Sequence, residues 1–165
     1  MAFPRAEQCE IRLATDGDSP GIVALVGRCF FDYERCWLDV DREETGLLSP
    51  SSAFTRFWVL AHGDRIYGSI ACNDHEAEAD HPRSVELKKC YVHPALRRQG
   101  VATRLVDLVE AHAQDFHAHT VELWSDTRFL QAHALYERLG YRRSGARREL
   151  GDISDTAEFH FVKTL

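Results

Sequence analysis

The chain has 165 residues, of which 44% are hydrophobic and 28% are charged, a length and composition that suit one domain and exclude a disordered chain. Its formal net charge of −6 argues against a general nucleic-acid binder, because such a protein needs a basic face to displace counterions from phosphate. No apolar run approaches the roughly 20 residues that a membrane-spanning helix needs, so no membrane partner is expected.

The first half of the chain predicts four strands and at least one helix. Alternation of polar and apolar residues at 10–14 predicts the first strand. Ser19-Pro20 is typical of a helix N-terminus, and apolar residues follow it at helical spacing up to Phe30. The stretch 39–53 is ambiguous and allows one more helix. Three more strands, the first two joined by a tight turn and the last two by a polar loop, are expected at 57–62, 65–72 and 84–92.

The second half predicts an amphipathic helix from about Gly100 to Phe116 and a shorter helix over 128–139, closed by Gly140. Strands are expected at 120–124, 141–150 and 157–163. This order of elements predicts an α/β fold, a mixed sheet flanked by helices, rather than a doubly wound Rossmann sheet. We expect one domain over residues 1–165, with its core at about 10–164.

Cysteine and histidine usage favours a reduced, cytoplasmic protein. The five cysteines show no CxxC spacing that would indicate a zinc site or a disulfide framework, and no apolar signal core follows the first residues. His112, His117 and His119 form the only histidine cluster near a helix end, and we expect no metal site there.

The most informative segment is the one from Val85 to Thr103, in which a strand ends, a short basic turn follows and a helix begins at Gly100. The first turn of a helix has unpaired backbone N–H groups and a partial positive charge, and a glycine lets these amides approach a phosphate closely. Arg97 and Arg98 add positive charge. The segment predicts an anion site of the kind that holds a diphosphate, although an ordinary strand-to-helix connection with solvated arginines is the alternative. Because a P-loop and a GxGxxG motif are absent, a nucleoside triphosphatase and a dinucleotide dehydrogenase are not expected.

Two motifs carry a resemblance to a known family. Arg97-x-x-Gly100-x-Ala102 resembles the Q/R-x-x-G-x-G/A signature of the GNAT superfamily of acyl-CoA-dependent N-acetyltransferases, and Tyr91-Val-His-Pro-Ala-Leu-Arg resembles the strand ending ahead of it. About 35 residues later, Ala132-x-x-Leu-Tyr136-Glu-Arg-Leu-Gly-Tyr141 is similar to the family's second motif. The element order agrees from residue 10 to 163.

The resemblance implies acetyl-CoA as co-substrate, no metal, and a central sheet that is splayed at a bulge in the fourth strand. In the family the diphosphate of CoA lies on the amides of the signature turn, and the pantetheine arm pairs with the end of the fourth strand. The positions that match are Cys90, Tyr91, Val92, Arg97, Arg98, Gln99, Gly100, Val101, Ala102 and Thr103. By the same resemblance the Cys90 amide donates to the thioester carbonyl.

The resemblance also implies catalytic roles. Tyr136 aligns with the family's general acid, which protonates the departing thiolate, whereas a core tyrosine is the structural alternative. Glu86 is the candidate base for an amine substrate, acting directly or through water, and the alternative is a strand glutamate paired with Lys88. Cys90 as a covalent nucleophile is the weaker alternative to direct attack.

One position departs from the family pattern. Phe129 stands where many members carry an asparagine that contacts pantetheine, which puts that contact in doubt. Asp126 is a candidate substitute, and a helix N-cap role explains Asp126 or Thr127 equally well. For His133, one turn before Tyr136, we expect a place on the helix surface.

The acceptor side is predicted only in outline. Residues 32–44 contain six acids and two bases, and residues 74–80 contain four acids and no base. If these segments wall the acceptor cleft, they attract a cationic amine on a small molecule or peptide, and a solvated acidic surface is the alternative. Aromatic residues beside the acids suggest an apolar or cation–π wall, namely Phe31, Tyr33 and Trp37.

A basic ribbon near the C-terminal strands is expected to pair with these acids or with a partner subunit, so a homodimer is left open. Its residues are Arg142, Arg143, Arg147 and Arg148.

Two functions of different classes remain. The first is an enzyme that moves an acetyl group from acetyl-CoA to a primary amine by direct attack in a ternary complex. The second is a catalytically silent acyl-CoA-binding regulatory module. Tyr136 and Glu86 favour the enzyme, because a sensor needs neither.

Overall fold

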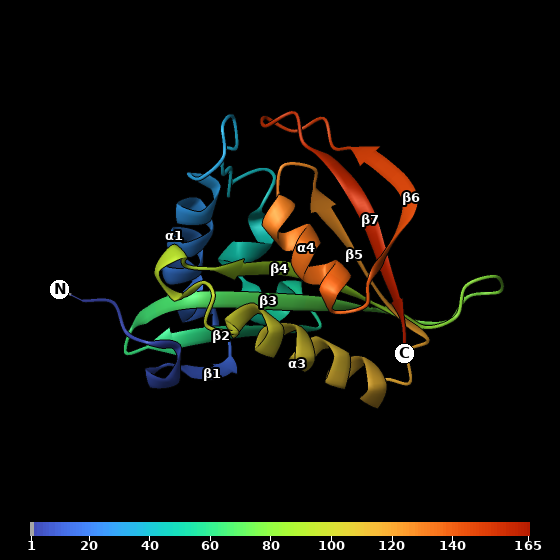
Figure 1. Ribbon diagram of the computed structural model, residues 1–165, viewed down its shortest axis with the longest axis horizontal. Coiled ribbons are helices and arrows are strands. Elements are labelled where there is room, and N and C mark those ends of the chain that lie inside the picture. The colour runs from blue at the N-terminus through green and yellow to red at the C-terminus, as the bar shows by residue number, and fades with distance from the viewer. Residues whose placement is uncertain (1) are drawn as a thin grey trace.

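Seven strands form one mixed sheet in the order β1-β2-β3-β4-β5-β7-β6 (Figure 1) in the computed structural model, which describes residues 2–165. Every neighbouring pair is antiparallel except β4 and β5, which are parallel. The strands are β1 (Glu10–Leu13), β2 (Arg56–His62), β3 (Arg65–His75), β4 (Ser84–Val92), β5 (Thr120–Asp126), β6 (Arg142–Glu149) and β7 (Ala157–Thr164). The expected mixed sheet is confirmed.

Helices cover both faces of the sheet. In Figure 1, α3 and α4 lie in front of the sheet and α1 lies behind it. The apolar stripe of α1, which includes Ile22 and Leu25, packs on Val59 and Ala71 of the sheet. The stripe of α3 packs on the opposite face around Ile70. The helices are α1 (Ser19–Phe30), α2 (Pro50–Ala53), α3 (Val101–Asp115) and α4 (Leu130–Arg138), with 3₁₀ turns at Ala6–Gln8, Asp16–Asp18, Thr45–Leu48 and Pro94–Leu96.

The ambiguous stretch 39–53 forms only short turns. No helix follows Asp39 directly, and the stretch instead contains the 3₁₀ turn and the single-turn helix α2. Strand β3 extends to His75, beyond the expected end at residue 72, because residues 73–75 still pair with the start of β4. No helix within residues 2–165 has both the length and the apolar character needed to cross a membrane.

The sheet opens between β4 and β5. These strands pair only from Ser84–Thr120 to Leu87–Leu123 and then separate. On its other side β4 changes register with β3 between Ser69 and Ala71, and Lys89 takes a positive φ of 54°. An extra residue in one strand increases its local twist and bends it away from its neighbour. The bulge expected from the resemblance is thus present, and it separates the ends of β4 and β5.

A partly buried ion pair connects the start of α1 to β1 and makes stability depend on pH. Both guanidinium ends of Arg12 donate to Asp18 at 2.8 Å. These hydrogen bonds lower the pKa of Asp18 from 3.8 to about 2, because their effect outweighs that of burial, which raises the pKa. A group whose pKa is lowered by folding stabilises the protein above its unfolded pKa and loses that contribution as the pH falls through its folded pKa.

We therefore expect Asp18→Asn to reduce the free energy of unfolding by about 1 kcal/mol near neutral pH, allowing for the partial exposure of Arg12. The difference from the parent protein should shrink toward zero as the pH falls to about 2. Urea unfolding at both pH values measures this. An equal loss at both would mean that the substitution acts through packing and not through the ion pair.

Candidate active site

The turn where β4 leads into α3 presents backbone amides that no helical hydrogen bond uses. Gly100 is the N-cap of α3 with φ +74°, and no heavy atom lies within 4 Å of the place a Cβ would take. The first hydrogen bond of the helix is donated by the Arg104 amide to the Gly100 carbonyl at 3.1 Å. The amides of residues 101–103 therefore precede the helical ladder, and together with the helix dipole they favour an anion.

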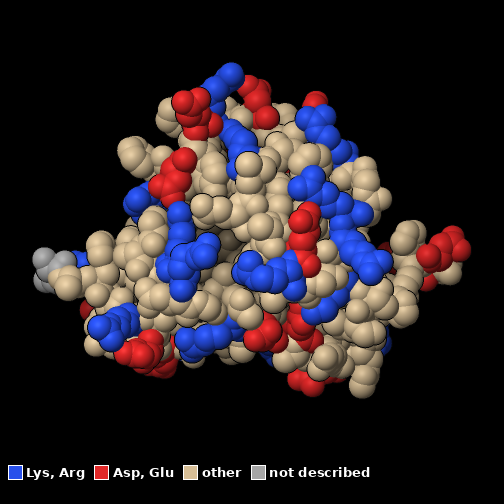
Figure 2. All heavy atoms as spheres, viewed as in Figure 1, with Lys and Arg blue, Asp and Glu red and all other residues tan. Residues whose placement is uncertain are grey.

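A cleft of about 490 Å³ opens over this turn. Figure 2 shows a hollow near the centre of the same face, with Lys and Arg side chains on two sides of it. Arg97 and Arg98 line the cleft from the turn and Arg138 from α4. Its other lining residues include the end of β4 and the first turn of α3, namely Cys90, Tyr91, Val92, Gly100, Val101, Ala102 and Thr103. Nine of the ten positions expected to bind the cofactor thus face one cleft.

Gln99 is the exception, because it is not among the residues that line the cleft. Its side-chain oxygen accepts a hydrogen bond from the Ala6 amide at 2.9 Å, and its amide nitrogen donates to the Ala95 carbonyl at 3.2 Å. The side chain therefore anchors the N-terminal segment beside the turn. A role for its backbone amide stays a prediction.

Arg97 is held in place by the protein itself. Its Nε donates to the Val92 carbonyl at 3.1 Å, and its Nη1 donates to Asp32 at 2.8 Å. Arg28 also donates to Asp32 at 2.8 Å, so two guanidiniums share one carboxylate. Residues 97 to 101 thus carry more positive charge than Asp32 neutralises, which suits a polyanionic ligand.

A second pocket, of about 350 Å³, adjoins the first and shares part of its wall. Residues common to both are Cys90, Tyr91, Phe129, Ala132 and Tyr136. The remaining wall comes from the segment between α1 and β2, from β4 and β5, and from the loop between β6 and β7, and it includes Trp37, Glu43, Glu44, Lys88, Lys89, Trp124, Asp126, Asp152 and Glu158. Two cavities therefore meet where β4 and β5 separate.

Tyr136 lies at this junction. It is 4% exposed, and it lines both pockets together with Cys90. Burial raises the pKa of Tyr136 well above 10, and burial likewise raises the pKa of Cys90 to about 12. Both groups therefore hold their protons at neutral pH. A phenol in this state suits a proton donor, whereas a thiol in this state is a poor nucleophile.

Glu86 lies on β4, four residues before Cys90, and is not among the residues that line either pocket. Lys88 donates to its carboxylate at 2.9 Å, and His75 lies 3.4 Å from it. Burial raises the pKa of Glu86, but these two partners outweigh burial and the net shift is downward. The ion pair with Lys88 on the same strand face is present as the structural alternative described, and Lys88 itself lines the second pocket.

Comparison with known proteins places the chain. Residues 20–141 match the family model described as "Acetyltransferase (GNAT) family". The chain belongs to the GNAT family. Over 117 residues it is 31% identical to N-acetylaspartate synthetase of Rattus norvegicus, an alignment that covers 69% of this chain and 37% of that protein. Over 126 residues it is 29% identical to human N-acetyltransferase 8, covering 76% of this chain and 56% of that protein. The chain thus spans between about a third and a little over half the length of these curated relatives.

Solved structures show the same fold. An acetyltransferase from Streptococcus agalactiae 2603 superposes with a TM-score of 0.78 at 16% identity, over 96% of this chain and 99% of that one. The protein yncA from Salmonella typhimurium, solved with its cofactor acetyl-CoA, superposes with a TM-score of 0.70 at 17% identity, over 96% and 94%. At such identities the likeness establishes the GNAT fold and nothing finer.

Phe129, the position that departs from the GNAT pattern, forms an aromatic wall between the two pockets. Its ring lies 4.6 Å from that of Tyr33 and 6.2 Å from that of Phe30. Asp126 does not cap the following helix: α4 begins at Leu130 with Phe129 as its N-cap. The Asp126 carboxylate instead accepts hydrogen bonds from the guanidinium of Arg128 at 2.7–3.2 Å, and the N-cap interpretation is wrong.

The surface position expected for His133 is also wrong. The residue is 2% exposed, and its Nε2 lies 2.9 Å from the Asp126 carbonyl and 3.1 Å from the Ser125 hydroxyl. These partners come from the end of β5, which the helix covers. Burial, with Arg143 nearby, lowers the pKa of His133, so a neutral ring tethers α4 to the sheet.

Of the two acidic segments expected to line the acceptor cleft, 32–44 and 74–80, only the first contributes to a pocket. Glu43, Glu44 and Trp37 line the second pocket, as expected for an acceptor wall. The segment 74–80, which is the end of β3 and the start of the following loop, does not: none of its residues is among the lining of either pocket, and in Figure 1 the loop extends beyond the edge of the sheet. Phe31 is 84% exposed and also lies outside both.

Some lining residues were missed by the sequence analysis. Lys89 and Trp124 face the second pocket from β4 and β5, and Arg138 faces the first from α4. Alternation along β5 predicts only that Trp124 and Leu123 point to opposite faces of the sheet, and it does not predict which groups Trp124 faces. In the basic ribbon, Arg143, Arg147 and Arg148 lie 3.5, 3.4 and 2.7 Å from Glu137, Glu149 and Glu158. These partners lie outside both acidic segments, so the expected pairing of these three arginines with the acidic segments is wrong.

Proposed function

We propose that this GNAT protein transfers an acetyl group from acetyl-CoA to a primary amine by direct attack in a ternary complex. The observation that carries the proposal is the meeting of two cavities at Tyr136 and Cys90. One cavity has an anion site at a helix N-terminus, and the other has a wall rich in carboxylates. A thioester that enters from the first and an amine that enters from the second would react at the shared wall.

The first cleft suits CoA along its length. The diphosphate would bind the amides of residues 101–103, with Arg98 and Arg138 at the sides. The pantetheine arm would run along the end of β4, which has no strand partner on the β5 side after Leu87. This arrangement carries the acetyl group to Cys90, whose backbone amide would donate to the carbonyl oxygen as negative charge develops there.

The second pocket suits a cationic acceptor. Five carboxylates and two lysines belong to its lining. Glu44 pairs with Lys89, Asp126 with Arg128 and Glu158 with Arg148, whereas Asp152 and Glu43 accept hydrogen bonds from backbone amides at 2.7 and 2.9 Å. The excess of negative charge would attract an ammonium group, with Trp37 and Trp124 offering aromatic faces.

Residues of the chain would move two protons. The amine has a pKa near 10 and must lose a proton before it attacks. Glu86 would accept that proton through water, the nitrogen would bond to the carbonyl carbon, and the carbon–sulfur bond would break. Tyr136 would donate its proton to the departing thiolate, which leaves as free CoA.

Calorimetry and a thiol-release assay test the proposal. Acetyl-CoA should bind with about one-to-one stoichiometry, and a panel of amines should then release free CoA in the presence of the protein. Binding without turnover of any amine would favour the regulatory module. Failure to bind acetyl-CoA would overturn both.

Removing the carboxylate at position 86 should reduce turnover in a pH-dependent way. We expect Glu86→Gln to lower kcat/KM about 100-fold near neutral pH. The deficit should narrow as the pH approaches the pKa of the amine, since free amine then needs no base. Glu122→Gln is the matched control, because Glu122 is the strand partner of Glu86 on β5 and has no role in the proposed proton transfers. A pH–rate profile of Glu86→Gln that overlies that of the parent protein would remove the base role.

Direct attack and a covalent mechanism differ at Cys90. Because burial raises the pKa of this thiol to about 12, we expect Cys90→Ala to keep turnover within about tenfold of the parent protein. Incubation with acetyl-CoA alone should leave no acetyl group on the protein by mass spectrometry. Loss of turnover in Cys90→Ala together with an acetylated Cys90 in the parent would instead establish a thioester intermediate.

A further inference from the structure

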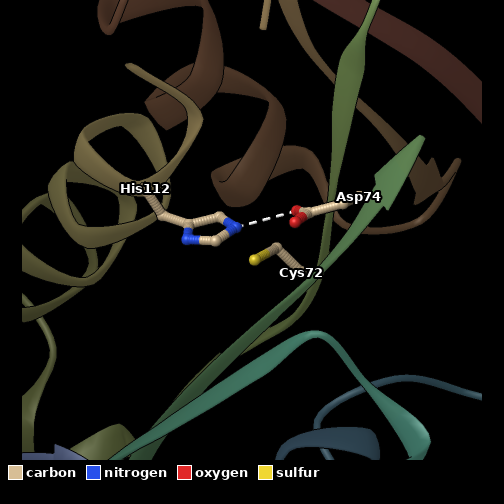
Figure 3. A group of neighbouring side chains, drawn as sticks. All are labelled: Cys72, Asp74 and His112. Carbon is tan, nitrogen blue, oxygen red and sulfur yellow. Dashed lines mark hydrogen bonds and ion pairs between the residues drawn. The ribbon is translucent and has the colours of Figure 1, made fainter. Parts of the chain in front are cut away.

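A third group of reactive side chains lies away from both pockets, between β3 and α3 (Figure 3). The Nε2 of His112 and a carboxylate oxygen of Asp74 are 2.8 Å apart, and the thiol of Cys72 points toward the same place. One ligand atom from each residue lies within 4.8 Å of the other two. No residue of this group lines either pocket.

The fold creates this group from residues that are distant in sequence. Cys72 and Asp74 are two apart on β3, so both side chains point to the same face of the sheet. Helix α3 crosses that face and directs His112 toward them from its last turn. The sequence analysis grouped His112 with His117 and His119, but the structure brings it to β3 instead.

We propose that Cys72, Asp74 and His112 bind a divalent zinc-like cation. A thiolate sulfur, an imidazole nitrogen and a carboxylate oxygen are the three ligand types that zinc takes in proteins, and water would complete a tetrahedron. Because the three ligands include a thiolate sulfur and an imidazole nitrogen, they favour zinc over magnesium or calcium, which prefer oxygen ligands alone. Binding would replace the hydrogen bond between His112 and Asp74 and would release the thiol proton of Cys72.

The surroundings suit such a site. Cys72 is fully buried, whereas the side chains of Asp74 and His112 are 19% and 16% exposed, which leaves a path for an ion from solvent. The imidazole is stacked on Phe116 with an interplanar angle of 2° and meets Trp58 edge-on. These rings restrict rotation of His112, so its Nε2 stays aimed at the two strand residues.

The expected consequence is structural. The ion would connect β3 to the C-terminal part of α3, whose N-terminal turn is the proposed diphosphate site. Since neither pocket contains a ligand of the ion, binding should stabilise the fold and take no part in acetyl transfer.

Cobalt substitution tests the site directly. Protein first treated with a chelator and then titrated with Co²⁺ should gain a sulfur-to-cobalt charge-transfer band and the strong visible bands of a tetrahedral ion. One equivalent of Zn²⁺ should abolish both, and Zn²⁺ should raise Tm. Absence of the charge-transfer band in the parent protein would overturn the proposal.

Variants locate the binding. Cys72→Ala should lose the charge-transfer band, and His112→Gln should weaken cobalt binding at least about 100-fold. Asp74→Asn, which keeps the size of the side chain, should weaken it similarly and covers the case in which Cys72→Ala fails to fold. Cys9→Ser and His117→Gln are matched controls outside the group and should bind as the parent does. Parent-like binding in Asp74→Asn and His112→Gln would show that the ion binds elsewhere.

Discussion

Replacement of Tyr136 by phenylalanine should lower kcat about 10²- to 10⁴-fold, the range associated with loss of a general acid. The phenol is buried where the two cavities meet, and its raised pKa keeps it protonated at neutral pH. Phenylalanine fills the same space and removes only the hydroxyl. The Kd for acetyl-CoA should therefore change little, and the loss should appear in kcat, measured by release of free CoA.

The matched control is Tyr141→Phe. Tyr141 is also buried, and the centre of its ring lies 5.9 Å from that of Tyr136. Its hydroxyl donates a hydrogen bond to Glu110 at 3.1 Å, and the residue lines neither pocket. This variant should remove one phenolic hydroxyl from the core with turnover close to that of the parent. If both variants lose turnover equally, the effect of Tyr136→Phe is one of packing. Turnover unchanged in Tyr136→Phe would remove its role as an acid.

A negative charge placed in the first turn of α3 should abolish most of the affinity for acetyl-CoA. Ala102 lines the first cleft beside the amides proposed to bind the diphosphate. A carboxylate about 6 Å from a phosphate, at the effective dielectric of a protein surface, opposes binding by about 3 kcal/mol, which is roughly 100-fold in Kd. The same carboxylate near a helix N-terminus stabilises the helix by a few tenths of a kcal/mol.

Ala102→Glu should thus bind acetyl-CoA about 100-fold more weakly by calorimetry while its free energy of unfolding stays level or rises. Ala102→Gln has the same size without the charge, so it separates repulsion from obstruction. An equal loss of affinity in both variants would mean that the larger side chain obstructs the site and that charge repulsion plays no part. Parent-like affinity in Ala102→Glu would show that the diphosphate does not lie on this turn, and the proposed function would fail with it.

Features that depend on local order were predictable. The helix periodicities that end at Phe30 and begin after Gly100, and the alternation along 84–92, reflect backbone geometry within a single element. The geometry of the turn at Gly100 was predictable for the same reason, because Arg97 through Thr103 are consecutive and one turn presents their amides together; anion binding there stays a prediction. Even the departure at Phe129 was visible, though its aromatic contacts were not.

Features that depend on packing between elements were not predictable in this way. The burial of His133 depends on Ser125 and Asp126 at the end of β5, which its own helix does not reveal. The ion pair that lowers the pKa of Glu86 joins two positions of one strand, yet whether that face meets a cavity depends on where β4 and β5 separate. The group of Cys72, Asp74 and His112 unites a strand and a helix about 40 positions apart.

The amino-acid sequence alone therefore determined the succession of elements, the mixed sheet and the turn at Gly100, because each follows from residues that are neighbours along the chain. Only the tertiary structure decided which side chains line the second cavity and which neutralise one another, since those contacts exist only after separate segments are packed together. The acceptor is the property that depends most on such contacts, because its proposed pocket is built from segments between residues 30 and 158.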